Sequence, residues 1–369
     1  MQIDMAGLTG SAPGALLAQT DNLFQMFPDQ RSTLAADVDW LFYFILWTCF
    51  VFWLIIVGCM VWFAYRYRRR PGVEPEPSPH HNTPLEVTWS VLPGFLLALM
   101  FYWGFTGYID MRTPPAKAYE INVTGQKWVW NFQYPNGHID SDLYVPANTP
   151  VRLVMSSTDV LHSLSIPAFR VKQDVVPGRY TELWFEATEP GEYQLFCTEY
   201  CGTDHSNMLS KVHVIAEDEF PAKLAEVSDI VKRFPIPWQA GAVLYLKRGC
   251  GSCHSVDGRD LDAGMKGPSF LRNYGQRRDF TDGTALEADE NYVRQSILEP
   301  QAKIRRGYQP VMPTFQGLLK EPEINVIIAF LKQLQDPNDA ELEEINAFLA
   351  DPKPPEPEAE ETADETTTE

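Results

Sequence analysis

The stretch CTEYCGTDHSNM, residues 197–208, carries two cysteines, a histidine and a methionine. It connects a predicted strand, GEYQLF (191–196), to another predicted strand, LSKVHV (209–214). Two thiols at this spacing are compatible with a disulfide loop, a zinc site or a copper site. The rest of the chain distinguishes these alternatives.

Short alternating segments rich in β-branched and aromatic residues surround this loop, from residue 119 onward. Asn136-Gly137 between two of them is a strong signal for a hairpin turn. Gly or Pro separates the further segments, and no helical period competes in this region. The spacing predicts an antiparallel sandwich or barrel over residues 115–217.

A further histidine, His162, stands at the end of another predicted strand, in DVLHSLSIP. A single copper on a β-sandwich takes one cysteine, two histidines and a weak methionine, whereas this sequence offers two cysteines. Two thiolates can bridge two coppers, with one imidazole on each metal and with Met208 and a backbone carbonyl as weak outer ligands. Soft sulfur ligands favour copper, because zinc seldom takes methionine. A disulfide would leave the histidines and the methionine without a role.

Two long uncharged segments, 40–65 and 87–109, precede the β-domain. At 1.5 Å per residue, the first would form about 39 Å of helix, enough to cross a hydrocarbon core of about 30 Å. A buried soluble hairpin is the alternative, which two runs of this length disfavour. We predict a transmembrane hairpin over 39–110, with helices at about 40–65 and 85–109, after an N-terminal periplasmic segment at 1–38.

The arginines of RYRRRP, which follow the first span, predict the orientation in the membrane. Residues 1–39 contain a single base, Arg31. The positive-inside rule therefore places the loop 66–86 in the cytoplasm and both soluble domains on the outer face. We expect a two-pass protein of a bacterial inner membrane.

The second predicted helix opens with TPLE. Thr83 as N-cap, Pro84 as the first helical residue and Glu86 three residues after the cap form a capping box. This capping role is sufficient to explain Glu86. A carboxylate at the mouth of a proton path is the functional alternative.

A second redox motif, CxxCH, lies in GCGSCHSVDG, after a charged linker predicted at 218–235. Cys250 and Cys253 have the spacing that forms thioethers to the two vinyl groups of a haem, and His254 would ligate the iron. A CxxC redox pair is the alternative. That reading needs a thioredoxin-like βαβ pattern, which the sequence lacks here.

Downstream features support the haem. GPSF resembles the loop whose proline carbonyl, here Pro268, orients the haem-ligating histidine. VMPTF offers Met312 as the sixth ligand, whereas Met265 is too close to CxxCH to reach the opposite haem face. PEINVIIAFLKQLQ, 322–335, predicts an amphipathic terminal helix. Residues 236–338 therefore resemble an all-α, class I cytochrome c domain, and His/Met ligation suits an electron carrier.

The net charge is −19, and residues 339–369 form an acidic tail. Its Pro, Glu and Thr content offers little to bury, so we expect the tail to be mostly disordered. This charge disfavours nucleic acid as a partner and would attract a basic protein. We expect His80, His81 and His138, outside both motifs, to be exposed to solvent.

Residues 30–217 resemble subunit II of the haem–copper cytochrome c oxidases. The resemblance rests on four motifs in order along the chain: NTPLEVTWSVLPG, GQKWVWNFQY, DVLHSLSIPAFRVKQDVVPGR and CTEYCGTDHSNM. It implies a multidomain membrane protein with a transmembrane hairpin, an all-β cupredoxin sandwich and a fused all-α cytochrome c domain.

The resemblance also implies a dinuclear CuA centre and roles for individual residues. The side-chain ligands would be His162, Cys197, Cys201, His205 and Met208. Glu199 would give its backbone oxygen, and its carboxylate would reach a Mg²⁺ at the interface with the catalytic subunit. Trp128 would receive electrons, and Glu86 would lie at the entrance of a proton pathway. Lys127 replaces the glutamine that often precedes this tryptophan, so the docking surface is expected to differ.

The implied function is electron transfer into a cytochrome c oxidase. Electrons would pass from a covalent haem c through CuA to subunit I, where oxygen is reduced to water with proton translocation. The expected partners are subunit I, subunit III, membrane lipid and a donor that is either a cytochrome c or a quinol:acceptor oxidoreductase complex. The alternatives are the electron-accepting subunit of a CuA-type nitric oxide reductase and a free-standing membrane electron carrier.

Overall fold

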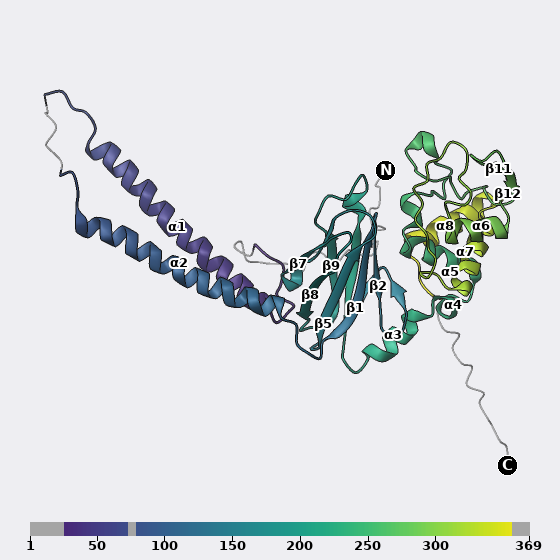
Figure 1. The fold of residues 1–369 in the computed structure, drawn as a ribbon, viewed down its shortest axis with the longest axis horizontal. Coiled ribbons are helices and arrows are strands. Elements are labelled where there is room, and N and C mark those ends of the chain that lie inside the picture. Colours follow the sequence, from purple (N-terminus) through teal and green to yellow (C-terminus); the bar gives the residue numbers. More distant parts are fainter. Residues whose placement is uncertain (1–25, 73–78, 356–369) are drawn as a thin grey trace, which may run out of the picture.

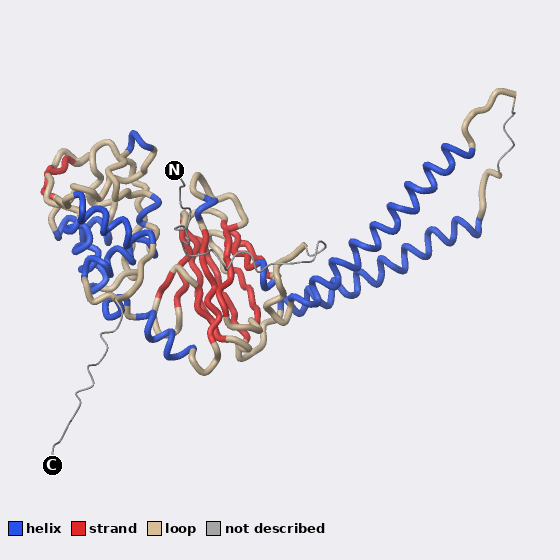
Figure 2. The backbone as a smooth tube through the Cα atoms, turned by 180° about the vertical axis from the view of Figure 1, so that it is seen from behind, coloured by secondary structure: helices blue, strands red, loops and turns tan. Residues whose placement is uncertain are grey.

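The computed structural model describes residues 26–72 and 79–355. Figure 1 shows three parts in a row, a long helical hairpin, a β-sandwich and a helical domain, and Figure 2 shows the same order from behind. Residues 1–25 of the predicted N-terminal segment and 356–369 of the predicted acidic tail lie outside the described residues.

The hairpin consists of α1 (Ala35–Arg66) and α2 (Thr83–Arg112), each somewhat longer than predicted. Both are long and apolar enough to cross a membrane, and neither buries its most apolar window within the protein. Large side chains such as Trp53 and Ile56 are exposed along α1. This apolar surface is suited to contact lipid or another membrane subunit.

The cap of α2 differs from the prediction. Asn82, not Thr83, is the N-cap residue, and its side chain accepts a hydrogen bond from the Leu85 N–H at 3.3 Å. Glu86 Oε1 accepts the Asn82 backbone N–H at 3.0 Å. The predicted cap residue was therefore wrong by one position, because the asparagine carbonyl also satisfies a free N–H of the first turn. Glu86 still bonds back to the cap.

Two five-stranded sheets form the sandwich. The first has the order β3 (Ile139–Asp140), β2 (Val129–Gln133), β1 (Tyr119–Gln126), β5 (Pro150–Ser157), β8 (Thr181–Glu186). The second has the order β4 (Leu143–Pro146), β10 (Leu209–Ile215), β9 (Gly191–Cys197), β6 (His162–Ile166), β7 (Val171–Val175). The pairs β1–β5 and β4–β10 are parallel, so the sheets are mixed and not antiparallel as predicted. Alternation along a strand reveals its buried face but not the direction of its neighbour.

The core of the sandwich fills the space between the sheets. Residues of β5 alternate between buried and partly exposed positions. Trp130, Phe132 and Phe185 are fully buried, together with Phe169 of the short helix η1 (Pro167–Phe169). This packing holds the strand ends on which the metal-binding candidates lie.

The segment 218–235, predicted as a charged linker, contains two short helices, α3 (Phe220–Ser228) and α4 (Ile230–Arg233). Phe220 and Leu224 of α3 pack into the core of the sandwich. Ile230 of α4 packs into the core of the helical domain. The apolar residues of this segment therefore attach it to both domains. They were not recognised in the sequence because charged residues surround them.

The helical domain contains four main helices. They are α5 (Pro237–Lys247), α6 (Glu290–Leu298), α7 (Glu321–Gln333) and α8 (Asp339–Ala350). The short elements are η3 (Cys250–Ser252), η4 (Leu261–Ala263), β11 (Arg277–Asp279) and β12 (Ala285–Glu287). A Cβ at Gly241 of α5 would lie 2.0 Å from the Val326 carbonyl oxygen, so α5 and α7 cross in backbone contact. The small β11–β12 hairpin is the one departure from all-α character within the described part of this domain.

Helix α8 occupies the start of the region that we predicted to be mostly disordered. Asn338 and Glu341 form its capping box. Ile345 is 1% exposed, and the Phe348 ring lies 5.3 Å from the Trp238 ring of α5. The prediction was wrong for residues 339–350, because acidic composition concealed two apolar residues at helical spacing.

Candidate metal centre and haem pocket

The loop 197–208, the copper-site loop, joins β9 to β10 at one end of the second sheet. These strands pair in antiparallel register, and the Cys197 N–H donates to the Met208 carbonyl oxygen at 3.2 Å, which closes the loop at its base. On the other side of β9, Leu164 of β6 pairs with Cys197. This register brings His162, two residues before Leu164, to the same sheet end.

The two cysteine sulfurs form the middle of the candidate metal centre. Cys197 Sγ and Cys201 Sγ lie 3.9 Å apart and are not bonded to each other. Each faces a different histidine: Cys197 Sγ lies 3.9 Å from His162 Nδ1, and Cys201 Sγ lies 3.5 Å from His205 Nδ1. The arrangement therefore has two halves, each with one imidazole.

A further donor lies beside each sulfur. The Glu199 carbonyl oxygen is 3.3 Å from Cys197 Sγ, and Met208 Sδ is 3.7 Å from Cys201 Sγ. All six predicted donors thus lie in one cluster, with sulfur, imidazole and either thioether or carbonyl oxygen in each half. Two thiols with this surrounding set of donors would suit a pair of copper ions.

The thiols differ in acidity. Burial opposes ionisation of Cys197, but the His162 imidazole beside it lowers its pKa to about 7. Burial and the neighbouring Cys197 raise the pKa of Cys201 to about 12. One thiolate therefore forms near neutral pH, and the second needs a positive charge such as a metal ion.

Asp159 was missed by the sequence reasoning, although it starts the motif DVLH. Its Oδ1 lies 2.9 Å from His162 Nε2, which leaves Nδ1 of that buried ring facing Cys197. Its Oδ2 accepts the Lys127 backbone N–H at 2.7 Å. Such a carboxylate orients a metal-binding histidine, and here it also links the site to the residue before Trp128.

Trp128 lies beside the copper-site loop and is only 8% exposed. A Cβ at Gly202, whose φ is +127°, would lie 3.2 Å from Trp128 Cζ2, so the loop passes close against the indole. Lys266 of the helical domain places Nζ 3.9 Å from the centre of the ring. The predicted site of electron arrival is thus covered by another part of the same chain.

The imidazole of His254 is held in one orientation. Its Nδ1 lies 2.8 Å from the Pro268 carbonyl oxygen, the hydrogen bond expected from GPSF, and its ring stacks on Phe270 with centroids 4.5 Å apart. Burial lowers the pKa of His254, which favours the neutral ring that ligates iron. A Cβ at Gly267 would lie 2.4 Å from His254 Cε1, so this glycine, which we had not singled out, is needed for the ring to fit.

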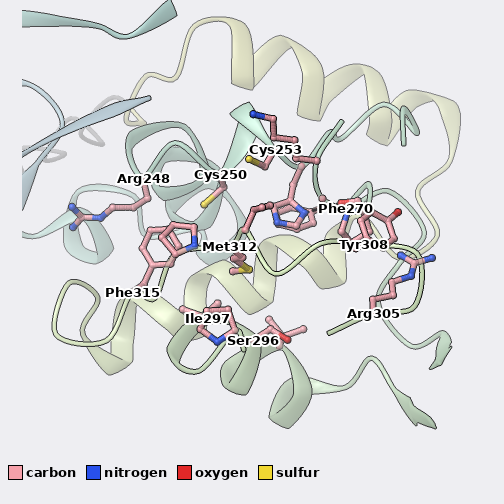
Figure 3. Close-up of a pocket in the computed structure, with 18 of the residues that line it drawn as sticks. Arg248, Cys250, Cys253, Phe270, Ser296, Ile297, Arg305, Tyr308, Met312 and Phe315 are labelled. Atoms are coloured by element: carbon pink, nitrogen blue, oxygen red, sulfur yellow. Dashed lines mark hydrogen bonds between the residues drawn. The ribbon is translucent and has the colours of Figure 1, made fainter. Parts of the chain in front are cut away.

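A pocket beside His254 is lined by Cys250, Cys253 and Met312 (Figure 3). Its apolar wall includes Ile297, Phe315 and Leu331, and its polar residues include Arg305 and Tyr308. Two thiols, one oriented imidazole, one thioether and apolar walls fit a covalently attached haem. The pocket also reaches Gln126 and Lys127 of the sandwich, so it extends to the boundary between the two domains.

Two predicted residues lie apart from this chemistry. Glu86 is at the start of α2, at the end of the hairpin away from the sandwich (Figure 1). Within the described residues, the candidate metal group of histidines, cysteines and carboxylates comprises His162, Cys197 and Cys201. Neither His205 nor the Glu199 carboxylate is part of this group, and the Glu199 contact with Cys197 Sγ is through its backbone carbonyl.

Comparison with known families matches the three parts separately. The model "Cytochrome C oxidase subunit II, transmembrane domain" matches residues 20–106, and "Cytochrome C oxidase subunit II, periplasmic domain" matches residues 136–215. "Cytochrome c" matches residues 238–335. The copper-site loop lies inside the second match, and CxxCH and Met312 lie inside the third.

Similar proteins carry the same description. Cytochrome c oxidase subunit 2 of Alkalihalophilus pseudofirmus is 34% identical over 281 residues, which span 73% of this chain and 79% of that protein. Cytochrome c oxidase subunit 2 of Cereibacter sphaeroides is 27% identical over 276 residues, 59% of this chain and 91% of that protein. The crystal structure of the periplasmic domain of subunit II of cytochrome oxidase of Bradyrhizobium japonicum is 31% identical, with a TM-score of 0.30. It covers 32% of this chain and 97% of its own.

Proposed function

The chain belongs to the cytochrome c oxidase subunit II family, and from this premise we propose that it receives electrons through its own covalent haem c and delivers them through CuA to subunit I. Membership makes it a membrane protein with a periplasmic domain and part of an oxidoreductase complex whose catalysis is in another subunit. The cytochrome c match adds an electron carrier to this subunit.

We assign the copper pair to the six donors of the cluster: His162, Cys197, the Glu199 carbonyl, Cys201, His205 and Met208. A haem would be held by Cys250 and Cys253 through thioethers and by His254 and Met312 through its iron, with Pro268 orienting the histidine. When bound, these groups supply one-electron chemistry. The reduction of oxygen to water and the associated proton translocation belong to subunit I.

The observation that carries this proposal is the contact of Trp128 with a loop of each candidate centre. Its indole lies close against Gly202 of the copper-site loop, and Lys266 of the helical domain places Nζ 3.9 Å from the centre of the same ring. The two loops therefore meet at one buried aromatic ring.

Partners and location follow the same family. The hairpin would bind subunit I in a bacterial inner membrane, beside subunit III and lipid, with a cytochrome c or a quinol:acceptor oxidoreductase complex as donor. Glu86 would lie at a proton entrance. The Mg²⁺ proposed through Glu199 gains no support from the described residues and would need ligands from subunit I.

The experiment is isolation of the complex in mild detergent, with copper and haem c counted per chain and oxygen consumption compared with nitric oxide reduction. We expect about two coppers, beyond any in subunit I, and one covalent haem. One copper, or none, contradicts the ligand set. Nitric oxide reduction without oxygen consumption would favour the reductase alternative, and isolation without any haem–copper subunit would favour a free-standing carrier.

A further inference from the structure

A cluster of charged residues joins the sandwich to the helical domain. Lys247, the last residue of α5, places Nζ 2.5 Å from Asp140 Oδ1 and 3.1 Å from Asp142 Oδ2. Asp140, at the end of β3, is 1% exposed, and the Lys247 side chain is 19% exposed. This interdomain ion cluster is therefore largely buried, in contrast to an exposed surface pair.

Neighbouring groups extend the contact. His138, which we expected to be solvated, is buried, and its Nε2 lies 3.3 Å from Asp140 Oδ2. The buried guanidinium of Arg248 donates to the Ile139 carbonyl oxygen at 3.1 Å and lies 3.5 Å from Glu323 Oε1 of α7. Two consecutive basic residues of the helical domain thus bind one short strand of the sandwich and the residues beside it.

The charges in this cluster are mutually stabilised. Burial by itself raises the pKa of Asp140, but the Lys247 ammonium and the His138 ring hold it well below its usual range. Burial lowers the pKa of Lys247, yet Asp140 and Asp142 raise it above its ordinary value. Both partners are therefore charged at neutral pH, and removal of either would leave a buried charge without its partner.

The cluster leads directly into the haem-attachment loop, residues 250–254. Gly249 has a φ of +68°, and a Cβ there would lie 3.2 Å from Val129 Cβ. Cys253 packs against the core of the sandwich. Gly249, just before the loop, therefore lies against Val129, next to Trp128.

We propose that Lys247, bound between Asp140 and Asp142, is a positioning residue that holds the haem-attachment loop against the sandwich, beside Trp128, in the orientation for interdomain electron transfer. A buried ion pair often contributes little net stability compared with an apolar contact of the same size, but it requires one geometry. Electron transfer between two domains requires that they keep a fixed orientation to each other. This inference rests on the proposed copper and haem centres, because it concerns transfer between them.

The test uses the full complex with Lys247→Met, which keeps the length of the side chain and removes its charge. Hydrogen exchange of segments 139–143 and 248–254 reports docking, and flash-induced reduction of the haem followed at the copper absorbance reports transfer. The observed rate scales with the docked fraction, so a fall of that fraction to one tenth slows transfer about ten-fold. We expect faster exchange in both segments and slower transfer.

Lys332→Met is the matched control. Lys332 pairs with Glu290 within the helical domain, and both side chains are exposed. This variant should leave exchange and transfer unchanged. Unchanged exchange and transfer in Lys247→Met, with haem and copper retained, would overturn the proposal.

Asp142→Asn covers the case in which Lys247→Met fails to fold. Asp142 is partly exposed, so its loss weakens the cluster without leaving Lys247 unpaired. It should increase exchange in the same segments, and no change there would count against the proposal. Hydrogen exchange can be measured without bound copper and without electron transfer. A protein that docks normally but lacks copper would therefore refute the proposed function and not the interdomain contact.

Discussion

Lys266 Nζ lies 3.9 Å from the centre of the Trp128 ring, so a residue of the helical domain covers the indole of the sandwich. The Trp128 Nε1 atom is buried without a hydrogen-bond partner among the residues that the structure describes. The face of Trp128 is thus occupied by an ammonium from the same chain, which attracts the π-electrons of the ring. An external donor would meet the helical domain before it met this tryptophan.

Replacement of Trp128 by phenylalanine should slow copper reduction by the haem while the copper and haem contents stay normal. The smaller ring leaves a gap between Gly202 and Lys266, which the indole now fills. Flash-induced absorbance changes in the intact complex measure the rate. Trp184→Phe is the control, since the Trp184 Nε1–H donates to the Asp110 carbonyl oxygen of α2, in the hairpin. Equal rates of electron transfer in Trp128→Phe and Trp184→Phe would show that Trp128 does not take part in transfer from haem to copper.

Substitution of Gly267 by alanine should impair haem attachment or axial ligation. The new methyl group would lie 2.4 Å from His254 Cε1, so the ring must move from the Pro268 carbonyl. Overpacking of this kind costs about 1–3 kcal/mol. Covalent haem staining and the haem absorption spectrum check this. Gly94→Ala, at a position with open space around the Cβ, should leave both unchanged.

Copper affinity of the metal-free protein should rise with pH, because binding replaces thiol protons. Below the Cys197 pKa of about 7 both thiols must lose a proton, and so must the His162 ring, whose pKa is lowered by burial but raised more by Asp159 and Cys197. At higher pH these two groups have already lost their protons, and Cys201, with a pKa of about 12, is the thiol that still must do so. Each released proton contributes about ten-fold in affinity per pH unit. Chelator competition from pH 6 to 8.5 should therefore show a steeper slope below about pH 7 than above. One slope across this range would contradict the assignment of two unequal thiols.

Truncation of Ile345 to alanine should destabilise the helical domain by about 2–5 kcal/mol, the usual cost of emptying a fully buried aliphatic site. Denaturation followed by the haem absorbance measures this change. Glu344→Ala, at the adjacent exposed position, should stay within about 0.5 kcal/mol. Equal stability of the two variants would mean that α8 is not part of the domain core.

The metal-binding candidates could be predicted from the sequence because five of the six donors lie within the copper-site loop. The sixth, His162, was recognised by its place at a strand end, and the register of β6 with β9 brings it to Cys197. Asp159 and Gly267 were missed, although both lie in quoted motifs. Their roles depend on which of their atoms face the rings of His162 and His254, and a sequence does not show how side chains and backbone are oriented.

The elements at domain boundaries were predicted least well. Phe220 and Leu224 of α3, and Ile345 of α8, lie among acidic residues that suggested linker and tail. Average composition conceals a few apolar residues at helical spacing. The parallel pairing of β1 with β5 was also not predictable, because it joins strands separated by three others along the chain.

The sequence by itself determined the chemistry of this protein: two spans, a two-thiol loop and a CxxCH motif, each set by residues close together along the chain. Only the tertiary structure decided how the two candidate centres face each other. That arrangement depends on contacts such as Lys247 with Asp140, 107 residues apart, and Lys266 with Trp128. A lysine in a sequence looks the same whether water or another domain surrounds it, because burial is a property of the folded chain.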